Sequence, residues 1–284
     1  MTRVTVGGMS LKSYASEIEV ASLAARRAGA LAAGYLHAGL TVERKEGDEP
    51  VTRADREASD LLVAAIGAAF PHDLIVSEEA PEAAARLGTL ERVWFIDPID
   101  GTNDFIQRLP GFAVMVGLCV DGEPTVGVVF QPMTDKLYTA APGHGAWLER
   151  AGGARSALST TATTTVEELR LVASRSHRTA QIDDVKRVLG VSDELNVGSV
   201  GLKLGLIAEG TRDLYVNPAS KCKAWDTCAP QAILTAAGGT LTDVHGRALG
   251  YGSITLGGAR GLVASNGAAH AGVIAKLAPL FAPS

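Results

Sequence analysis

The feature of this sequence that most constrains its fold is an apolar run that ends in two aspartates. Residues 94–104 read Trp-Phe-Ile-Asp-Pro-Ile-Asp-Gly-Thr-Asn-Asp. The apolar residues 93–96 predict a buried strand that ends at Pro98, because proline cannot donate a hydrogen bond to a neighbouring strand. The turn that follows can direct Asp97, Asp100 and the carbonyl oxygen of Ile99 toward one point. Hard oxygen ligands of this kind suit Mg²⁺.

The residues after the second aspartate predict an anion site. Gly101 tolerates backbone conformations that other residues avoid, and residues 102–109 predict a short helix that stops before Pro110. Amide groups at the start of a helix attract anions such as phosphate. We therefore expect Gly101 and Thr102 to bind phosphate beside the two aspartates.

Acidic residues also occur at the ends of three other predicted elements. Glu78 follows an apolar run, while Asp55 and Asp226 lie at the starts of helical patterns. A helix cap or a solvated strand end would explain each of these acids taken singly, and an Asx turn would explain Asp97 and Asp100. Acids at four separate element ends, one of them beside a Gly-Thr helix start, favour a single metal and phosphate site.

Together these motifs resemble those of the lithium-sensitive, Mg²⁺-dependent phosphomonoesterases, which include inositol monophosphatase, fructose-1,6-bisphosphatase and the 3′(2′),5′-bisphosphate nucleotidases. The family pattern is Asp-Pro-x-Asp-Gly-Thr with an upstream Glu-Glu and a downstream Trp-Asp. This sequence has those residues, in the same order, at 97–102, 78–79 and 225–226. The resemblance covers roughly residues 15–280, and the combined pattern is specific.

The resemblance implies an α/β (α+β) layered sandwich of the inositol monophosphatase and fructose-1,6-bisphosphatase type. It places an N-terminal half with most of the metal ligands at residues 1–150. A C-terminal half with Asp226 and the substrate-recognition residues then covers 151–284. Residues 152–165 are rich in small polar side chains and are expected to join the halves. The active site is expected between them.

The resemblance also implies two to three Mg²⁺ ions per active site and a metal-activated water that hydrolyses a phosphate ester. The implied ligands are Glu78, Asp97 and the Ile99 carbonyl for one ion, Asp97, Asp100 and Asp226 for a second, and Asp55 with Glu78 for a weaker third. In this scheme Thr102, hydrogen-bonded to Asp55, orients the water. Thr102, Asp55 and Glu78 are thus the expected catalytic residues.

Within the family, the C-terminal half is similar to the bisphosphate nucleotidases. Inositol monophosphatases carry a glutamate shortly before the Trp-Asp pair, whereas this sequence has no acid between Tyr215 and Asp226 and has Lys221 and Lys223 instead. A carboxylate that accepts hydrogen bonds favours binding of a neutral polyol, whereas cationic side chains favour binding of a second phosphate. The lysines therefore favour a substrate with two phosphates, although a solvated basic loop would also explain them.

The resemblance suggests six substrate contacts, namely Ser176, His177, Ser199, Lys203, Lys221 and Lys223. His177 can stack on a base or simply satisfy a turn, and Lys203 can equally be a surface residue. Val216 and Asn217 depart from the family pattern, since some nucleotidases have an arginine there. That departure leaves recognition of the base and of the 5′-phosphate open.

Composition narrows the function only slightly. The 284 residues are 46% hydrophobic and carry a formal charge of -5, which argues against binding to nucleic-acid polymers. The alanine-rich residues 20–40 contain Arg26 and Arg27 and predict an amphipathic helix rather than a membrane span. Three cysteines without zinc-like spacing favour reduced thiols in a cytoplasm. We expect a small phosphorylated substrate and no association with a membrane. The sequence leaves open whether the chain forms a homodimer.

The sequence therefore leaves three functions open. The first is hydrolysis of the 3′-phosphate of adenosine 3′,5′-bisphosphate (PAP) to AMP. The second is an inositol monophosphatase or a related sugar phosphatase. The third is a metal-dependent regulatory or binding protein without catalysis, which is disfavoured because every implied metal ligand is present in the sequence.

Overall fold

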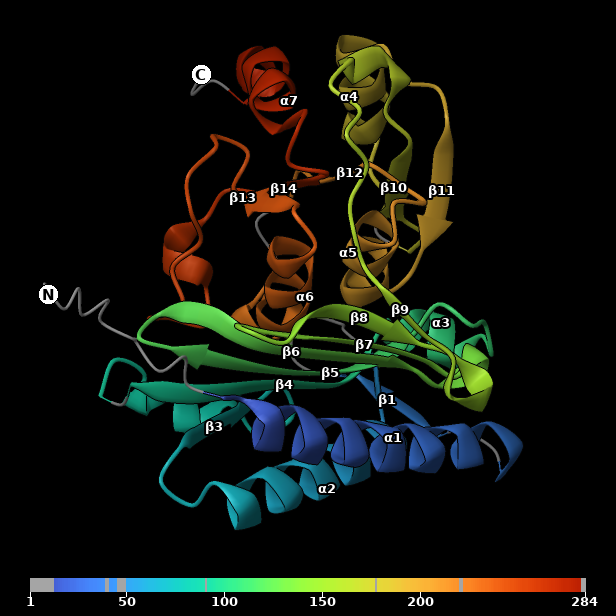
Figure 1. Cartoon of the computed structure of the whole chain (residues 1–284). Helices are drawn as coiled ribbons and strands as arrows, with labels where there is room; N and C mark the ends of the chain where they lie inside the picture. Colours follow the sequence, from blue (N-terminus) through green and yellow to red (C-terminus); the bar gives the residue numbers. More distant parts are fainter. Residues whose placement is uncertain are drawn as a thin grey trace, which may run out of the picture.

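The computed structural model describes residues 13–38, 41–44, 50–89, 91–176, 178–219 and 222–281. In this part of the chain, helices and sheets stack in alternating layers (Figure 1). Helices α1 and α2 form the first layer, a large sheet the second, α5 and α6 the third, a smaller sheet the fourth, and α4 and α7 the fifth. The predicted layered α/β sandwich is confirmed.

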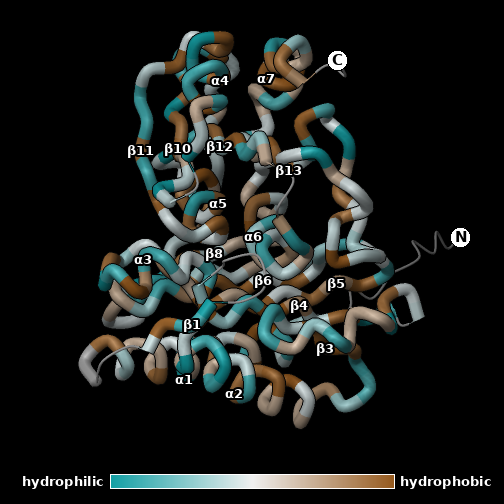
Figure 2. Tube along the Cα trace, turned by 180° about the vertical axis from the view of Figure 1, so that it is seen from behind, coloured by the Kyte–Doolittle hydropathy of each residue, from teal (hydrophilic) through white to brown (hydrophobic). Residues whose placement is uncertain are grey.

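The helices of the described residues are α1 (Ala15–Ala38), α2 (Arg53–Ala69), α3 (Thr102–Ile106), α4 (Gln181–Leu189), α5 (Val200–Ala208), α6 (Ala224–Ala236) and α7 (His270–Leu277). Helix α1 confirms the helix expected over the alanine-rich segment. Its buried side chains are mostly alanines, which let it pack closely against the sheet. Figure 2 shows hydrophobic and hydrophilic stretches alternating along α1 and α2, as one-sided burial requires.

The larger sheet has the strand order β3-β4-β5-β6-β7-β8-β9, and only β3 and β4 are parallel. Its strands are β3 (Leu74–Ser77), β4 (Arg92–Asp100), β5 (Ala113–Val120), β6 (Glu123–Gln131), β7 (Lys136–Ala141), β8 (Gly145–Glu149) and β9 (Arg155–Ala157). Strands β1 (Val42–Arg44) and β2 (Pro50–Thr52) form a separate antiparallel pair.

The smaller sheet has the order β11-β10-β12-β14-β13, in which β14 is antiparallel to both of its neighbours. Its strands are β10 (Leu171–Ser174), β11 (Glu194–Val197), β12 (Leu214–Asn217), β13 (Thr240–Thr242) and β14 (Leu262–Ser265). One face packs against α4 and α7 and the other faces α5 and α6. Helices α5 and α6 are therefore enclosed between two sheets.

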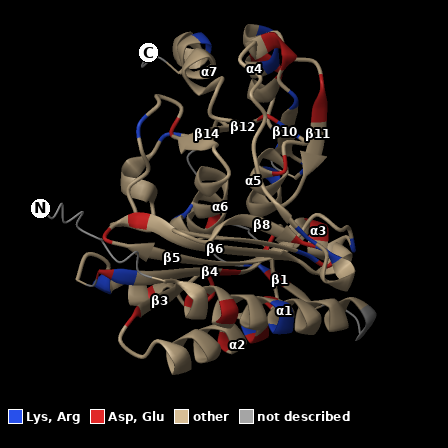
Figure 3. Ribbon diagram, in the orientation of Figure 1, with Lys and Arg blue, Asp and Glu red and all other residues tan. Residues whose placement is uncertain are grey.

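Strand β4 is buried on both faces because its apolar residues alternate between two cores. Trp94 and Ile96 pack with residues of α1 and α2, while Val93 and Phe95 pack with residues of α5 and α6. The strands of the larger sheet carry few charged side chains (Figure 3). The acids at the end of β4 are thus exceptions in an apolar layer.

One sequence prediction about a strand boundary is wrong. Strand β4 does not end at Pro98 but continues to Asp100, with a register shift between Asp97 and Asp100. Pro98 lies inside that irregularity, where no ladder hydrogen bond is required of it. The expected linker 152–165 contains β9, which pairs with β8 and extends the larger sheet to Ala157. The division into halves at residue 150 stays a prediction.

Candidate active site

Four other carboxylates lie close enough to Asp97, near the end of β4, to act on it electrostatically. The Asp97 side chain is only 2% exposed, and burial raises its pKa well above the ordinary range. The negative charges of four other acids raise this pKa further: Glu78, Asp100, Asp226 and Asp55. The fold thus brings together the acids predicted from four separate elements.

Asp55 and Asp226 occupy equivalent positions in two different helices. Each is the third residue of its helix and accepts a hydrogen bond from the backbone amide of the N-cap residue, Thr52 at 2.8 Å for Asp55 and Lys223 at 2.6 Å for Asp226. An acid at this position stabilises the start of a helix. The explanation of Asp226 as an N-cap residue is therefore wrong, since Lys223 holds that position.

Glu78 is positioned by the parallel pairing of β3 with β4. Its backbone amide donates to the carbonyl of Ile96 at 3.0 Å, which places Glu78 beside the residue that precedes Asp97. The hydroxyls of Ser59 in α2 and Ser77 in β3 lie 2.8 Å apart in a buried hydrogen bond. The same bond ties α2, which carries Asp55, to this edge of the sheet.

The turn after β4 requires a glycine at position 101. Gly101 has φ +92° and is the N-cap of α3, and a Cβ atom there would lie 2.8 Å from the carbonyl oxygen of Gly111. The Thr102 hydroxyl donates to the Ile99 carbonyl at 3.1 Å and to Asp55 Oδ1 at 3.4 Å. The predicted contact of Thr102 with Asp55 is therefore present, and α3 is shorter than the helix predicted over 102–109.

Asp100 is oriented by the start of α5. Its Oδ2 atom accepts from the Ser199 hydroxyl at 2.5 Å and from the Gly201 amide at 2.8 Å. Ser199 is fully buried, and its hydroxyl also accepts from the Leu202 amide as the cap of α5. A serine just before a helical run is a recognisable cap signal. The sequence interpretation missed it and treated Ser199 only as a substrate contact.

Lys203 is buried behind the acids, so the alternative of a surface residue is wrong. Its side chain is 1% exposed, and its ammonium donates to the carbonyls of Gly198 at 2.7 Å and Val197 at 3.3 Å. The ammonium also lies 5.2 Å from the ring centroid of Tyr215. Burial lowers the pKa of Lys203 to about 8, while the charge of Asp100 acts in the opposite direction. Lys203 is a basic neighbour of the acid cluster.

The chemistry of this cluster fits magnesium. Its donors are carboxylate oxygens and a backbone carbonyl, and burial together with the neighbouring negative charges raises the pKa of Asp97. Within the described residues no three acidic, histidine or cysteine side chains already converge as in a formed metal site. Several of the carboxylate oxygens accept hydrogen bonds from the protein instead.

Of the remaining predicted substrate residues, the structure describes Ser176 and Lys223. Ser176 is exposed just after β10, and Lys223 is half-buried. His177 and Lys221 lie outside the described residues. One pair of residues near this site was not predicted at all: Arg175 donates to the buried carboxylate of Asp104 at 2.5 Å.

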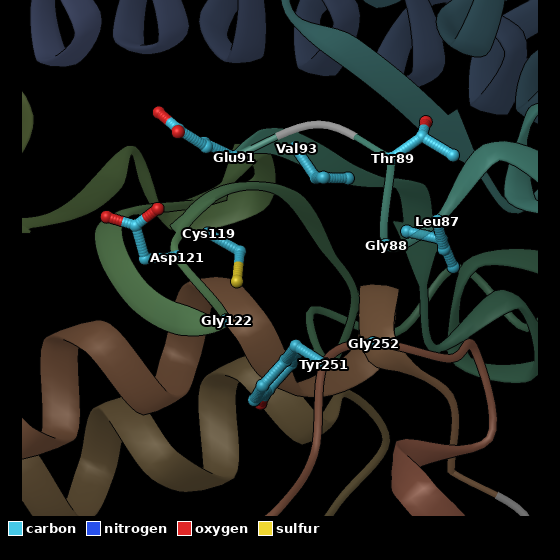
Figure 4. Close-up of a pocket in the computed structure, with 10 residues that line it drawn as sticks. All are labelled: Leu87, Gly88, Thr89, Glu91, Val93, Cys119, Asp121, Gly122, Tyr251 and Gly252. Carbon is cyan, nitrogen blue, oxygen red and sulfur yellow. The ribbon is translucent and has the colours of Figure 1, made fainter.

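A cavity of about 310 Å³ lies at the opposite end of β4 (Figure 4). It is bordered by Val93 at the start of the strand, by Cys119 and Asp121 at the β5–β6 hairpin, and by Tyr251. None of the predicted site residues lines it. The acid cluster, and not this cavity, is therefore the candidate active site.

Comparison with known proteins agrees with the fold. The sequence model of the inositol monophosphatase family matches residues 14–280. The 3′(2′),5′-bisphosphate nucleotidase CysQ of Salmonella typhimurium is 36% identical over 213 residues, which cover 73% of this chain and 82% of that protein. The inositol-1-monophosphatase of Bacillus subtilis is 32% identical over 238 residues, or 80% and 85% of the two chains.

Among solved structures, the IMPase of Thermotoga maritima superposes with a TM-score of 0.79 at 25% identity, covering 93% of this chain and 98% of that one. The order of layers described above is therefore shared with a known phosphatase fold. Because the family match spans nearly the whole chain and the two relatives are each more than 30% identical, this chain belongs to the inositol monophosphatase family of phosphatases.

Proposed function

We propose that this phosphatase is a Mg²⁺-dependent 3′(2′),5′-bisphosphate nucleotidase that hydrolyses the 3′-phosphate of PAP to give AMP. The single observation that supports phosphate-ester hydrolysis is the placement of four other carboxylates close enough to buried Asp97 to act on it electrostatically. Magnesium bound there would supply a nucleophilic water and would neutralise charge on the leaving oxygen. The chain's own residues would supply position, orientation and proton transfer.

In this proposal the ligand sets are those implied by the family resemblance. Glu78, Asp97 and the Ile99 carbonyl would hold one ion, and Asp97, Asp100 and Asp226 would hold a second. Asp55 with Glu78 would hold a weaker third. Support comes from the electrostatic coupling of Asp97 to all four of the other acids. The bulge between Asp97 and Asp100 supports the shared site, because it lets two residues of one strand face the same point.

Thr102 and Asp55 are the proposed proton path. The Thr102 hydroxyl donates to Asp55 Oδ1, so its lone pairs can accept from the attacking water and orient it. The proton of the water then passes to Thr102 Oγ1 as the proton of Thr102 passes to Asp55. The amides of Gly101 and Thr102 are proposed to hold the phosphoryl oxygens beside this path.

The charges near Asp226 in the sequence support a substrate with two phosphates. The loop between Tyr215 and Asp226 holds no acid that would bind a polyol, and Lys223 lies three residues before the proposed metal ligand. Lys203 lies behind Asp100, while Ser176, His177, Ser199 and Lys221 complete the proposed contacts. The 36% identity to a protein named as a bisphosphate nucleotidase supports the same choice.

Inositol monophosphatase activity is the second candidate. The specific observation in its favour is the Bacillus subtilis relative, which matches a larger share of this chain than the nucleotidase does. We also propose that the enzyme works in the cytoplasm, because all three of its cysteines are free thiols. Among the described residues, no helix is long and apolar enough to cross a membrane.

A substrate panel tests the proposal. Phosphate release with Mg²⁺ is measured from PAP, inositol 1-phosphate and fructose 1,6-bisphosphate at equal concentrations. We expect the highest kcat/KM on PAP. A higher kcat/KM on inositol 1-phosphate would replace the proposed substrate by the second candidate, and no release from any phosphomonoester would exclude catalysis altogether.

A further inference from the structure

An ion pair between a buried carboxylate and a partly exposed guanidinium joins the segment that carries Asp100 to the smaller sheet. Asp104 lies in α3, four residues after Asp100, and its side chain is 0% exposed. Arg175 follows β10 and donates from Nη1 to Asp104 Oδ2 at 2.5 Å. The same guanidinium donates from Nη2 to the carbonyl of Asn196 at 2.9 Å, and the Arg175 amide donates to the carbonyl of Val197 at 3.1 Å.

The Asp104 carboxylate fills a space that two glycines leave for it. A Cβ atom at Gly111 would lie 1.8 Å from Asp104 Oδ2, and one at Gly198 would lie 2.6 Å from Asp104 Cγ. Both distances are far below van der Waals contact, so no larger residue fits at either position. The Gly198 amide also donates to the carboxylate. The carboxylate of Asp104 therefore fixes where Gly198 lies.

The residues directly after Gly198 are those that orient Asp100. The Ser199 amide donates to the Gly111 carbonyl at 2.8 Å, and the Ser199 hydroxyl and the Gly201 amide both donate to Asp100. The turn at 198–201 is consequently held between two carboxylates of one segment, Asp104 on one side and Asp100 on the other.

Stability does not explain this ion pair well. Asp104 Oδ1 is buried and has no hydrogen-bond partner among the described residues. A buried carboxylate with an unsatisfied oxygen costs free energy, and replacing such a pair by neutral side chains is often neutral for stability or stabilising. A comparable pair elsewhere, Asp213 with Arg170, has both carboxylate oxygens satisfied.

We propose that Asp104 and Arg175 are positioning residues that, through the turn at 198–201, hold Asp100 in the orientation needed to bind Mg²⁺. This inference rests on the metal site of the proposed function. Neither residue contacts the ion in this scheme. They act through Ser199 and Gly201, as outer hydrogen-bond partners act on the ligands of other metal sites.

The test is the affinity for Mg²⁺, measured by isothermal titration calorimetry on the full chain without substrate. The variant Asp104→Asn/Arg175→Met removes both charges with little change of shape. The matched control is Asp213→Asn/Arg170→Met, because the two pairs have nearly the same side-chain exposures, 0% and 38% against 1% and 37%. We expect Mg²⁺ binding to weaken about 10- to 100-fold in the first variant and to change less than about twofold in the control.

A second readout separates positioning from general loss of structure. The Mg²⁺ concentration for half-maximal activity should rise in Asp104→Asn/Arg175→Met, while KM for substrate at saturating Mg²⁺ should stay close to that of the wild type. Arg175→Lys keeps one charged contact and should give an intermediate loss of affinity, which provides a test even where the double variant does not fold.

Equal Mg²⁺ affinities in the wild type and in the folded Asp104 and Arg175 variants would overturn the inference and leave the metal site intact. Equal weakening in the control pair would also overturn it, because loss of any ion pair with a buried carboxylate would then have the same effect. A wild-type chain that binds no Mg²⁺ would overturn the proposed metal site itself, and the inference with it.

Discussion

Ser199 donates a 2.5 Å hydrogen bond to Asp100, and these two residues are 99 positions apart in the sequence. Asp100 ends a strand of the larger sheet, whereas Ser199 caps a helix that packs between the two sheets. Asp100, a candidate metal ligand at the end of the larger sheet, is therefore oriented by the first residues of α5. In the chain, α5 comes directly after β11 of the smaller sheet. The candidate active site depends on how these layers are docked.

Ser199→Ala tests this dependence. Loss of the hydroxyl removes a hydrogen bond from Asp100, and we expect the affinity for Mg²⁺ to fall about 10- to 100-fold. The lost helix cap should also lower the free energy of unfolding by about 1 kcal/mol. Calorimetric Mg²⁺ titration measures the first effect and urea denaturation the second. Ser199→Thr, which keeps a hydroxyl, is the control, and unchanged Mg²⁺ affinity in Ser199→Ala would contradict the assignment.

The lysines before Asp226 test the choice of substrate. Removing both charges in Lys221→Ala/Lys223→Ala should weaken PAP hydrolysis and leave inositol 1-phosphate nearly untouched. A charge-assisted contact is worth about 1.5–3 kcal/mol when partly desolvated, which corresponds to roughly a ten- to hundred-fold loss of kcat/KM. The measurement is kcat/KM on both substrates at fixed salt.

Lys276→Ala provides the matched control for these lysines, because Lys276 pairs with Glu167 on an exposed surface of α7. It should change neither substrate's kcat/KM. Equal losses on PAP and on inositol 1-phosphate in the double variant would show that Lys221 and Lys223 do not bind a second phosphate.

Inhibition by Li⁺ tests whether this chain belongs to the lithium-sensitive phosphatases of its family. The family resemblance implies that Li⁺ inhibits only when Mg²⁺ occupies the tighter site. A monovalent ion can occupy an oxygen-ligand site without supplying the charge that a leaving phosphate ester needs. We expect inhibition in an assay of phosphate release with Mg²⁺ present. Activity that is indifferent to Li⁺ would place the chain outside that subgroup.

His270 predicts how stability depends on pH. Its ring nitrogens lie 2.9 Å from the hydroxyls of Thr242 and Ser265, and burial lowers its pKa from the ordinary value of 6.5. Below that value the unfolded chain binds a proton that the folded chain does not, so the contribution of His270 to stability is lost as the pH falls.

The measurement for His270 is the free energy of unfolding between about pH 7 and pH 5, compared with His270→Gln. The wild type should lose more stability than the variant over this range, because glutamine does not titrate. Parallel pH profiles for the two proteins would show that His270 is protonated equally in the folded and unfolded chains.

The elements and acids of the site could be predicted because their signals are local. The apolar residues before Asp97 indicate a strand by their own pattern, and Asp55 and Asp226 stand at helix starts that composition makes visible. These acids can then be assigned to one site, because several carboxylates at element ends have few uses other than cation binding.

The rest depends on contacts between distant segments. Arg175 and Asp104 are 71 positions apart, and nothing in the residues around either one indicates the other. The burial of Lys203 follows from the way the second sheet covers α5, which no local pattern reports. Pro98 was expected to end β4, because propensity does not reveal that a bulge would accommodate it.

The most direct test of the central claim, a Mg²⁺-dependent phosphatase built around Asp97, is phosphate release from PAP by Asp97→Asn. The neutral amide keeps the shape of the side chain and removes the charge that is proposed to bridge two cations. With the variant shown to be folded by circular dichroism, the account predicts that turnover with Mg²⁺ is abolished. Near-wild-type turnover would contradict it.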